Sequence, residues 1–201
     1  MPALPASQAL ILASASPRRR DFLQRLGYEL EVRPAEIDET WWDGESPHDY
    51  VLRVATAKAD AVQAPGRWVL AADTTVTIDG LVLAKAADEA EARQMLQRLS
   101  GRSHQVLTAF ALRGPGGSVA EVVATSVEMV AISDDLLEQY VACGEWRDKA
   151  GAYAIQGIGA ALVSAVRGSV TNVAGLPLAE VVAQLVRLGG PGPRFTQGQP
   201  A

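Results

Sequence analysis

Cysteine is nearly absent from this chain, and aromatic residues are few. A single cysteine, Cys143, among 201 residues excludes an internal disulfide framework and favours a reducing compartment. Aromatic residues make up 5% of the sequence and hydrophobic residues 48%, so we expect a mainly aliphatic core, as is typical of α/β enzymes. We interpret Cys143 as a buried thiol in preference to the nucleophile of a Cys–His hydrolase.

Positive charge is not in excess, and no hydrophobic run is long. The net charge of −5 disfavours binding to a nucleic-acid polymer by bulk electrostatics, so the basic residues are expected to act locally, in a pocket. No apolar stretch is long enough to span a bilayer, and residues 1–5 lack the basic region and apolar run of a secretion signal. We therefore expect a cytoplasmic protein that binds no membrane. The sequence leaves open whether it forms a homodimer.

Zinc-ligand spacing and a P-loop are also missing. The two histidines, His48 and His104, do not have the spacing of zinc ligands. His104 lies at the start of a predicted strand and is expected to be structural. No Gly-x-x-x-x-Gly-Lys-[Ser/Thr] segment occurs, which excludes a P-loop protein.

The length and the order of predicted elements define the expected fold. The chain is long enough for one well-packed domain, which we place at residues 1–188, followed by a tail at 189–201 that we expect to be disordered. Strands and helices alternate at first, and antiparallel strand pairs follow, which predicts an α/β fold with a mixed, twisted β-sheet flanked by helices. The predicted strands are 9–13, 28–33, 68–72, 75–78, 81–83, 105–112, 119–132 and 161–166, and the predicted helices are 17–26, 47–63, 88–99, 134–142 and 177–188.

A turn with two hydroxyls and three arginines connects the first strand to the first helix. Ser16 is a good N-cap, and Pro17 suits the first helical position. The N-terminus of a helix favours phosphate, and arginine adds a fork of donors that matches phosphate oxygens. The alternative is a helix cap followed by a solvated basic turn. Arg20 is interpreted as solvated under either hypothesis.

A second polar segment, Asp73 and Thr74, follows the predicted central strand 68–72. Ligands of open α/β sheets bind beyond the carboxyl ends of strands, so we expect this segment to lie beside the Ser14 turn. Lys58 falls near the apolar face of a predicted helix and is expected to be half-buried, with its ammonium group able to reach the site. The alternative for Lys58 is a lysine whose aliphatic stem alone is buried.

Carboxylates gather in the loop after the second strand, at Glu36, Asp38 and Glu39. Trp41 and Trp42 follow, and we interpret them as a hydrophobic plug on the core in preference to a lid. Carboxylates beside cations suit a metal-bound polyphosphate, because magnesium takes both carboxylate and phosphate oxygens. A spare carboxylate can accept a proton from water. The residues pooled in this way are the cations Arg18, Arg19, Lys58 and Lys85 and the carboxylates Glu36 and Asp73.

Five segments, taken together, resemble the Maf family. They are residues 12–19, 72–74, 99–101, 148–157 and 175–178, and the match runs in order from about residue 9 to residue 188. The resemblance implies a fold like that of the inosine triphosphatases, the Maf/Ham1 fold. It also implies a nucleoside triphosphate pyrophosphatase, a hydrolase of acid anhydrides. Such an enzyme converts a nucleoside triphosphate to its monophosphate and pyrophosphate with a divalent cation, Mg²⁺ or Mn²⁺.

The resemblance also implies roles for individual residues. Asp73 is the expected proton acceptor and binds the metal together with Glu36, for which Asp38 or Glu39 is the alternative. Lys58 and Lys85 are expected to act in catalysis beside the phosphates. The residues expected to bind the nucleotide are Ser14, Arg18, Arg19, Thr74 and Gln156.

Three residues indicate a branch of the family. Arg18, Thr74 and Gln156 match the branch that hydrolyses dTTP and UTP, and modified pyrimidine nucleotides are further candidate substrates in the house-cleaning of nucleotide pools. The amide of Gln156 can pair with the donor and acceptor edge of uracil or thymine, although a loop hydrogen bond without a part in base choice is the alternative. Ala86 and Val170 depart from the family pattern, which affects loop shape and not the reaction class.

A different class of function is a nucleotide-binding regulator of cell division or septum formation that does not hydrolyse its ligand. An intact Asp73 with its lysine partners favours the enzyme, because a protein that only binds need not keep them.

Overall fold

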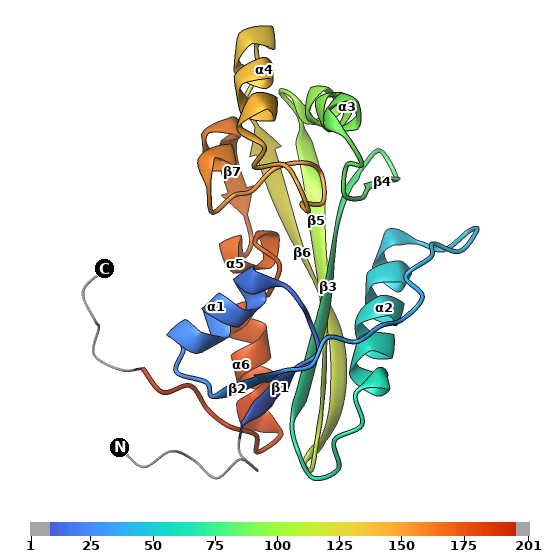
Figure 1. Cartoon of the computed structure of the whole chain (residues 1–201), viewed down its shortest axis with the longest axis vertical. Helices are drawn as coiled ribbons and strands as arrows, with labels where there is room; N and C mark the ends of the chain where they lie inside the picture. The colour runs from blue at the N-terminus through green and yellow to red at the C-terminus, as the bar shows by residue number, and fades with distance from the viewer. Residues whose placement is uncertain (1–8, 196–201) are drawn as a thin grey trace.

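The computed structural model describes residues 9–195, which form one mixed α/β domain (Figure 1). A seven-stranded sheet has the order β2-β1-β3-β5-β6-β7, with β4 paired to β3. Its strands are β1 (Leu10–Leu12), β2 (Leu30–Val32), β3 (Val69–Ile78), β4 (Leu81–Leu83), β5 (Ser103–Gly114), β6 (Gly117–Met129) and β7 (Val163–Arg167). The helices are α1 (Pro17–Arg25), α2 (Pro47–Ala61), α3 (Glu89–Leu99), α4 (Asp134–Cys143), the 3₁₀ helix η2 (Ile158–Leu162), α5 (Val170–Val173) and α6 (Leu178–Arg187).

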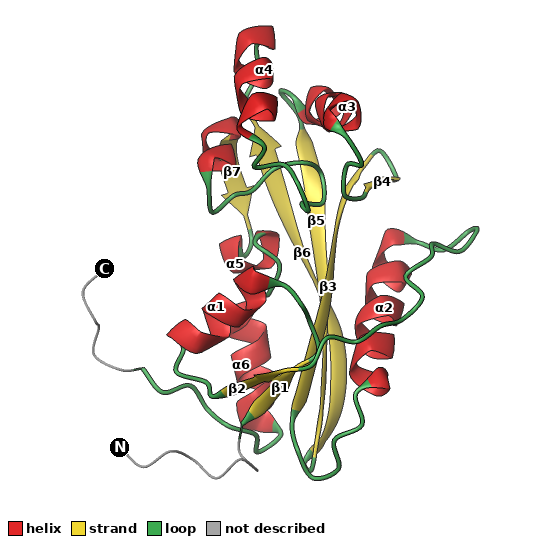
Figure 2. Ribbon diagram, viewed as in Figure 1, coloured by secondary structure: helices red, strands yellow, loops and turns green. Residues whose placement is uncertain are grey.

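The sheet is mixed, as predicted, and helices flank it. Strands β1, β2 and β3 pair in parallel, whereas β3, β5, β6 and β7 pair antiparallel. In the lower half of the molecule α2 covers one face of the sheet, and α1 and α6 cover the other (Figure 2). Helices α3 and α4 lie in the upper half, and the long strands β5 and β6 connect the two halves. None of the helices in the described part of the chain is long and apolar enough to cross a membrane.

Alternation along β1 shows how the lower half is packed. Leu10 and Leu12 belong to the core between the sheet and helices α1 and α6, whereas Ile11 and Ala13 belong to the core under α2. All four side chains have no exposed surface, so β1 is buried on both faces, as its continuous apolar run predicts. A third core fills the upper half, around Leu96, Val127 and Tyr140.

The cap predicted at Ser16 is confirmed, and other helices begin in the same way. The side chains of Ser16, Ser46 and Ser133 accept hydrogen bonds from backbone N–H groups in the first turns of α1, α2 and α4. Asp88 caps α3 in the same way. Helix α5 was not predicted; the side chain of Ser169 caps it by accepting a hydrogen bond from the backbone N–H of Asn172.

The prediction that a strand ends at Ala72 is wrong. Strand β3 continues from Val69 to Ile78, because β5 pairs with it from Val69↔Arg113 to Thr77↔Gln105. Neighbouring β1, however, pairs with β3 only as far as Leu12↔Leu70. Asp73 therefore lies in the middle of a strand, yet directly beyond the carboxyl end of the parallel strand next to it.

The expectation of a buried cysteine is also wrong. Cys143 is exposed, because the buried face of α4 consists of Leu137, Tyr140 and Val141. The predicted tail falls partly outside the described residues, at 196–201. Within 189–195, the backbone N–H of Gly190 donates to Leu185 O at 2.8 Å, and that of Arg194 donates to Leu26 O at 2.8 Å.

His104 is structural, as expected. Its ring is 3% exposed, and its Nε2 lies 2.8 Å from the hydroxyl of Tyr153. Burial lowers the pKa of His104 to about 4. Below about pH 6.5 the unfolded chain binds a proton at this site that the folded protein does not bind until about pH 4. The free energy of unfolding therefore falls as the pH is lowered through this window.

Between pH 7 and pH 4, we expect the free energy of unfolding of His104→Gln to fall by about 3 kcal/mol less than that of the wild type, because glutamine does not titrate. Urea unfolding of both proteins at the two pH values measures this difference, and the contributions of the carboxylates cancel. Equal losses of stability in the two proteins would contradict the prediction.

Candidate active site

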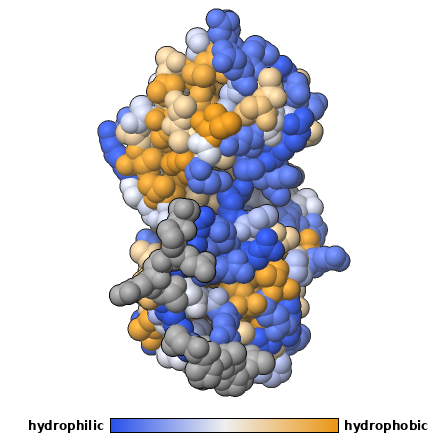
Figure 3. All heavy atoms as spheres, turned by 60° about the vertical axis from the view of Figure 1, so that its left-hand side comes forward, coloured by the Kyte–Doolittle hydropathy of each residue, from blue (hydrophilic) through white to orange (hydrophobic). Residues whose placement is uncertain are grey.

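A cavity of about 1350 Å³ lies where the end of β1 meets the middle of β3. Its walls come from the N-terminus of α1, the inner face of α2, β3, and the loops at 34–41 and 145–157. Hydrophilic residues gather around the waist between the two halves of the molecule (Figure 3). The predicted site residues that line the cavity are Ser14, Arg18, Arg19, Lys58, Asp73, Thr74, Lys85 and Gln156.

Arg19 organises one wall of the cavity. Its guanidinium group donates to Ser14 Oγ at 3.1 Å, to Ala72 O at 2.8 Å, to Gly175 O at 2.8 Å and to Thr74 Oγ1 at 3.0 Å. Ala72 O is free to accept because β1 has already ended there. Burial lowers the pKa of Arg19, and the charge of Asp73 opposes that shift. These contacts use four of the five N–H donors of arginine, so one remains for a ligand.

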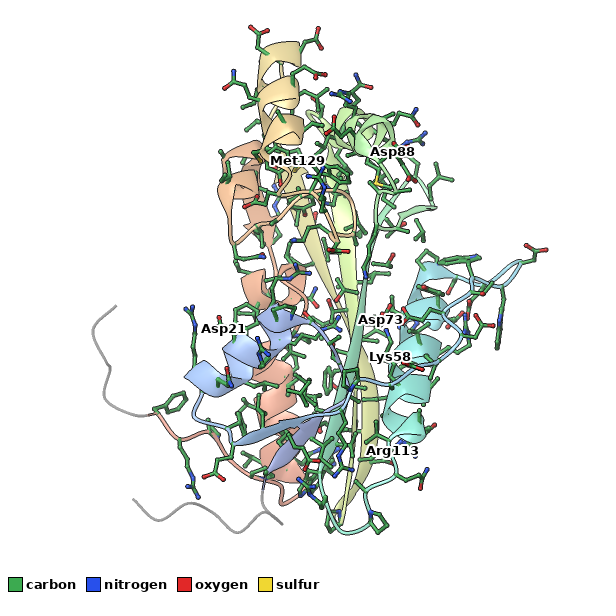
Figure 4. The ribbon with its side chains drawn as sticks, in the orientation of Figure 1. Asp21, Lys58, Asp73, Asp88, Arg113 and Met129 are labelled. Atoms are coloured by element: carbon green, nitrogen blue, oxygen red, sulfur yellow. The ribbon has the colours of Figure 1, made fainter. Side chains whose placement is uncertain are left out.

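Asp73 and Lys58 form the centre of the opposite wall. Lys58 Nζ donates to Asp73 Oδ1 at 2.9 Å, and the two side chains meet between α2 and β3 (Figure 4). Lys58 Nζ also lies 2.9 Å from Glu39 Oε1. Lys58 and Asp73 are 9% and 8% exposed, so Lys58 is buried more completely than the half-buried position predicted for it.

Glu39, and not Glu36, faces the cavity. The 34–41 segment contributes Pro34, Ala35, Glu39 and Trp41 to the lining. The hydroxyl of Tyr50 donates to Glu39 O at 3.1 Å and so fixes the backbone at this point. Of the three carboxylates in the loop, the structure therefore places the alternative, Glu39, beside Asp73.

The two tryptophans do not plug the core. Trp42 is 57% exposed, and its ring lies under the guanidinium group of Arg53, with 3.8 Å from Cζ to the ring centroid. Trp41 stacks on Tyr50 with 4.7 Å between ring centroids, and both rings line the cavity. Arg53 holds this segment outside the core, because it donates to Thr40 O at 2.9 Å and to Glu45 Oε2 at 2.8 Å.

Three further cations, Arg18, Lys85 and Lys149, line the cavity and form no salt bridge in the described part of the chain, although the charge of Asp148, in the same lining, acts on Arg18 and Lys149. Arg18 Nε donates to Ala174 O at 3.2 Å, and Lys149 Nζ donates to Arg147 O at 2.9 Å. Burial lowers the pKa of Lys149, and the charges of Arg18 and Lys85 lower it further, whereas the carboxylates of Asp148 and Glu145 oppose the shift. Lys149 belongs to the 148–157 segment that resembles the Maf family, but no role was predicted for it from the sequence.

Gln156 lies on the far wall, in the same loop. Gln156 is among the residues that line the cavity, and its side-chain amide has no hydrogen-bond partner within residues 9–195, so its donors and acceptor are free to meet a ligand.

The carboxylates fit a hard divalent cation that arrives with a ligand. The carboxylates of Asp73 and Glu39 both contact the ammonium group of Lys58, so oxygens from both residues can approach one divalent cation. Among the described residues no group of three or more His, Cys, Asp or Glu side chains could hold a metal. A cation bound here would complete its shell with water and phosphate oxygens, as magnesium does with nucleotides.

Fold and site together define a mixed α/β protein whose cavity sets unpaired cations opposite a carboxylate pair. The family model described as Maf-like protein matches residues 9–188, and the chain belongs to this family.

Named relatives share most of the chain. A protein of Anaeromyxobacter dehalogenans strain 2CP-1, named dTTP/UTP pyrophosphatase, is 55% identical over 188 residues, which are 92% of this chain and 96% of the relative. A protein of Anaeromyxobacter sp. strain Fw109-5 with the same name is 52% identical over 197 residues, 96% of this chain and 95% of the relative. A solved structure of a HAM1 protein from Coxiella burnetii is 21% identical, with a TM-score of 0.42 over 60% of this chain and 72% of that one.

Proposed function

We propose that this protein hydrolyses dTTP and UTP to the nucleoside monophosphate and pyrophosphate, as a house-cleaning enzyme of the cytoplasmic nucleotide pool. The observation that carries the proposal is the buried pair of Asp73 and Lys58, 2.9 Å apart, in a cavity that also contains Arg18, Lys85 and Lys149, which form no salt bridge within the described residues. The names of the relatives at 52–55% identity support the same substrates.

The cations suit the triphosphate. Arg18, Lys85 and Lys149 supply fixed positive charge on one side of the cavity, and their mutual repulsion is relieved when phosphate enters. Binding by several cations orients the chain of phosphates, which removes the entropic cost of alignment before reaction.

Asp73 is the proposed proton acceptor. Lys58 donates to one of its oxygens, Oδ1, and holds the carboxylate in place. Water attacks the α-phosphorus and gives a proton to Asp73. The bond between the α-phosphorus and the oxygen that bridges it to the β-phosphate breaks, so that pyrophosphate leaves. Asp73 and Glu39 would hold the divalent cation, which would neutralise the charge that develops on the phosphate oxygens.

Product analysis tests the proposal. Purified protein with UTP and Mg²⁺ is expected to release UMP and pyrophosphate in equal amounts, which chromatography separates. Release of orthophosphate, or binding of UTP with no product, would overturn it; the second result would favour a regulator that only binds nucleotide.

The metal requirement can be tested on two carboxylates of one loop. We expect EDTA to abolish activity and Mg²⁺ or Mn²⁺ to restore it. Glu39→Gln removes a charged ligand and should raise the Mg²⁺ concentration for half-maximal activity by roughly 10-fold or more. Glu36→Gln is the matched control, because Glu36 does not line the cavity. If Glu36→Gln raised the Mg²⁺ concentration for half-maximal activity and Glu39→Gln did not, Glu36 would be the residue that binds the metal.

A further inference from the structure

Glu145 lines the cavity, yet all its hydrogen bonds are made to the protein. Its Oε1 accepts from the backbone N–H of Ile158 at 2.8 Å, and its Oε2 accepts from that of Gly159 at 2.7 Å. The hydroxyl of Tyr140 donates to Oε2 at 3.0 Å. Burial opposes ionisation of this carboxyl, but the two N–H groups and the hydroxyl outweigh it and lower the pKa of Glu145.

Tyr140 extends this network to the other side of Gln156. Its hydroxyl accepts from the backbone N–H of Ala154 at 3.3 Å, and the side chain is 3% exposed in the upper core. The segment between α4 and β7 is therefore tied at Ala154 through Tyr140 and at Ile158 and Gly159 through Glu145 (Figure 1). Gln156 lies between the two ties.

The fit around Glu145 is close. A Cβ at Gly157 would lie 1.9 Å from Glu145 Oε1, so any larger residue there would displace the carboxylate. Each oxygen already accepts a strong donor, and Glu145 is therefore poorly suited to take a proton from water or to bind a cation. Its chemistry is that of a fixed acceptor.

We infer that Glu145, together with Tyr140, is a positioning residue that sets where the amide of Gln156 meets the base of the nucleotide. The inference rests on the proposed function, because it assigns this network to the part of the site that chooses the base. Of the cations at the phosphate end, Arg18 and Lys85 make no hydrogen bond to Glu145 or Tyr140, whereas Lys149 is coupled to the charge of Glu145, which Tyr140→Phe leaves in place. Base choice and phosphate binding should therefore separate in variants of this network.

The test uses Glu145→Gln and Tyr140→Phe. In the glutamine variant an NH₂ group must face at least one N–H or O–H donor; the phenylalanine variant keeps the charge of Glu145 and removes the hydroxyl. We expect the ratio of kcat/KM for UTP to that for CTP to fall roughly 10-fold in each, mainly through a higher KM for UTP. Inhibition by pyrophosphate should stay within about twofold of the wild type in Tyr140→Phe. Glu138→Gln is the control, since Glu138 lies on α4 and pairs with Arg93 at the surface.

A second measurement does not depend on activity. Amide hydrogen exchange without nucleotide should be faster at residues 154–159 in both variants, and unchanged there in Glu138→Gln. Faster exchange with an unchanged UTP/CTP ratio would overturn the inference, as would equal losses for UTP, CTP and pyrophosphate. A wild-type protein without preference for UTP would instead contradict the proposed function, and the exchange experiment would still show whether Glu145 holds the segment.

Discussion

Replacing Asp73 by asparagine is expected to lower kcat for UTP by roughly 10²- to 10⁴-fold, because the amide cannot accept the proton of the attacking water. Asparagine keeps the shape of the side chain, and Glu39 remains as a charged partner for Lys58. The cations at the phosphate end are untouched, so KM for UTP should change much less than kcat. Steady-state measurement of pyrophosphate release gives both constants.

The control for this variant lies on the same β-hairpin. Asp79 follows β3, is paired with Arg102 at 2.7 Å and is exposed, so Asp79→Asn removes an equal charge outside the cavity. It should leave kcat unchanged. Near-wild-type turnover in Asp73→Asn would mean that the proton acceptor is another group, with Glu39 the next candidate by position.

Preference for UTP and dTTP over CTP, ATP and GTP is the second large effect, and we expect it to depend on Gln156. Uracil and thymine present an acceptor, an N–H donor and a second acceptor along one edge, and a free amide can meet a donor and an acceptor together. Cytosine reverses part of this pattern. A site that pairs with a polar edge rejects analogues that leave its groups unpaired, by up to roughly 10⁴-fold.

Gln156→Glu removes the amide donors and adds a negative charge. We expect kcat/KM for UTP and dTTP to fall more than that for CTP or GTP, which the four substrates measured on both proteins will show. Gln63→Glu, an exposed residue after α2, controls for the added charge. Equal losses for all four nucleotides would show that Gln156 shapes the loop without contacting the base.

Local signals allowed much of this structure to be predicted. The cap at Ser16, the proline after it and the apolar run of β1 define the strand–turn–helix unit by themselves. The continuity of β3 could not be predicted in the same way, because Asp73, Thr74 and Thr75 resemble a strand end. Their pairing partners on β5 lie more than 30 residues further along the chain and decide the outcome.

The site shows the same division. Lys58 and Asp73 could be predicted from their local sequence, because Lys58 falls on the buried face of a helix and Asp73 follows an apolar run. The choice of Glu39 over Glu36 depends on Tyr50 and Lys58, which belong to a helix later in the sequence. Irregular loops carry no periodicity that would indicate which carboxylate points inward.

The hydrogen bonds of Arg19 also affect when this wall of the cavity can fold during synthesis of the chain. The guanidinium group is buried, and one of its acceptors, Gly175 O, lies 156 residues further along the chain. During synthesis from the N-terminus, α1 and β3 emerge long before that acceptor, and until it arrives this buried charge lacks one of its partners. The wall that holds Ser14 and Thr74 is therefore completed only after synthesis has reached Gly175. A chain released before Gly175 would contain all seven strands of the described sheet but would lack this acceptor and helix α6, so the wall around Arg19 would be incomplete.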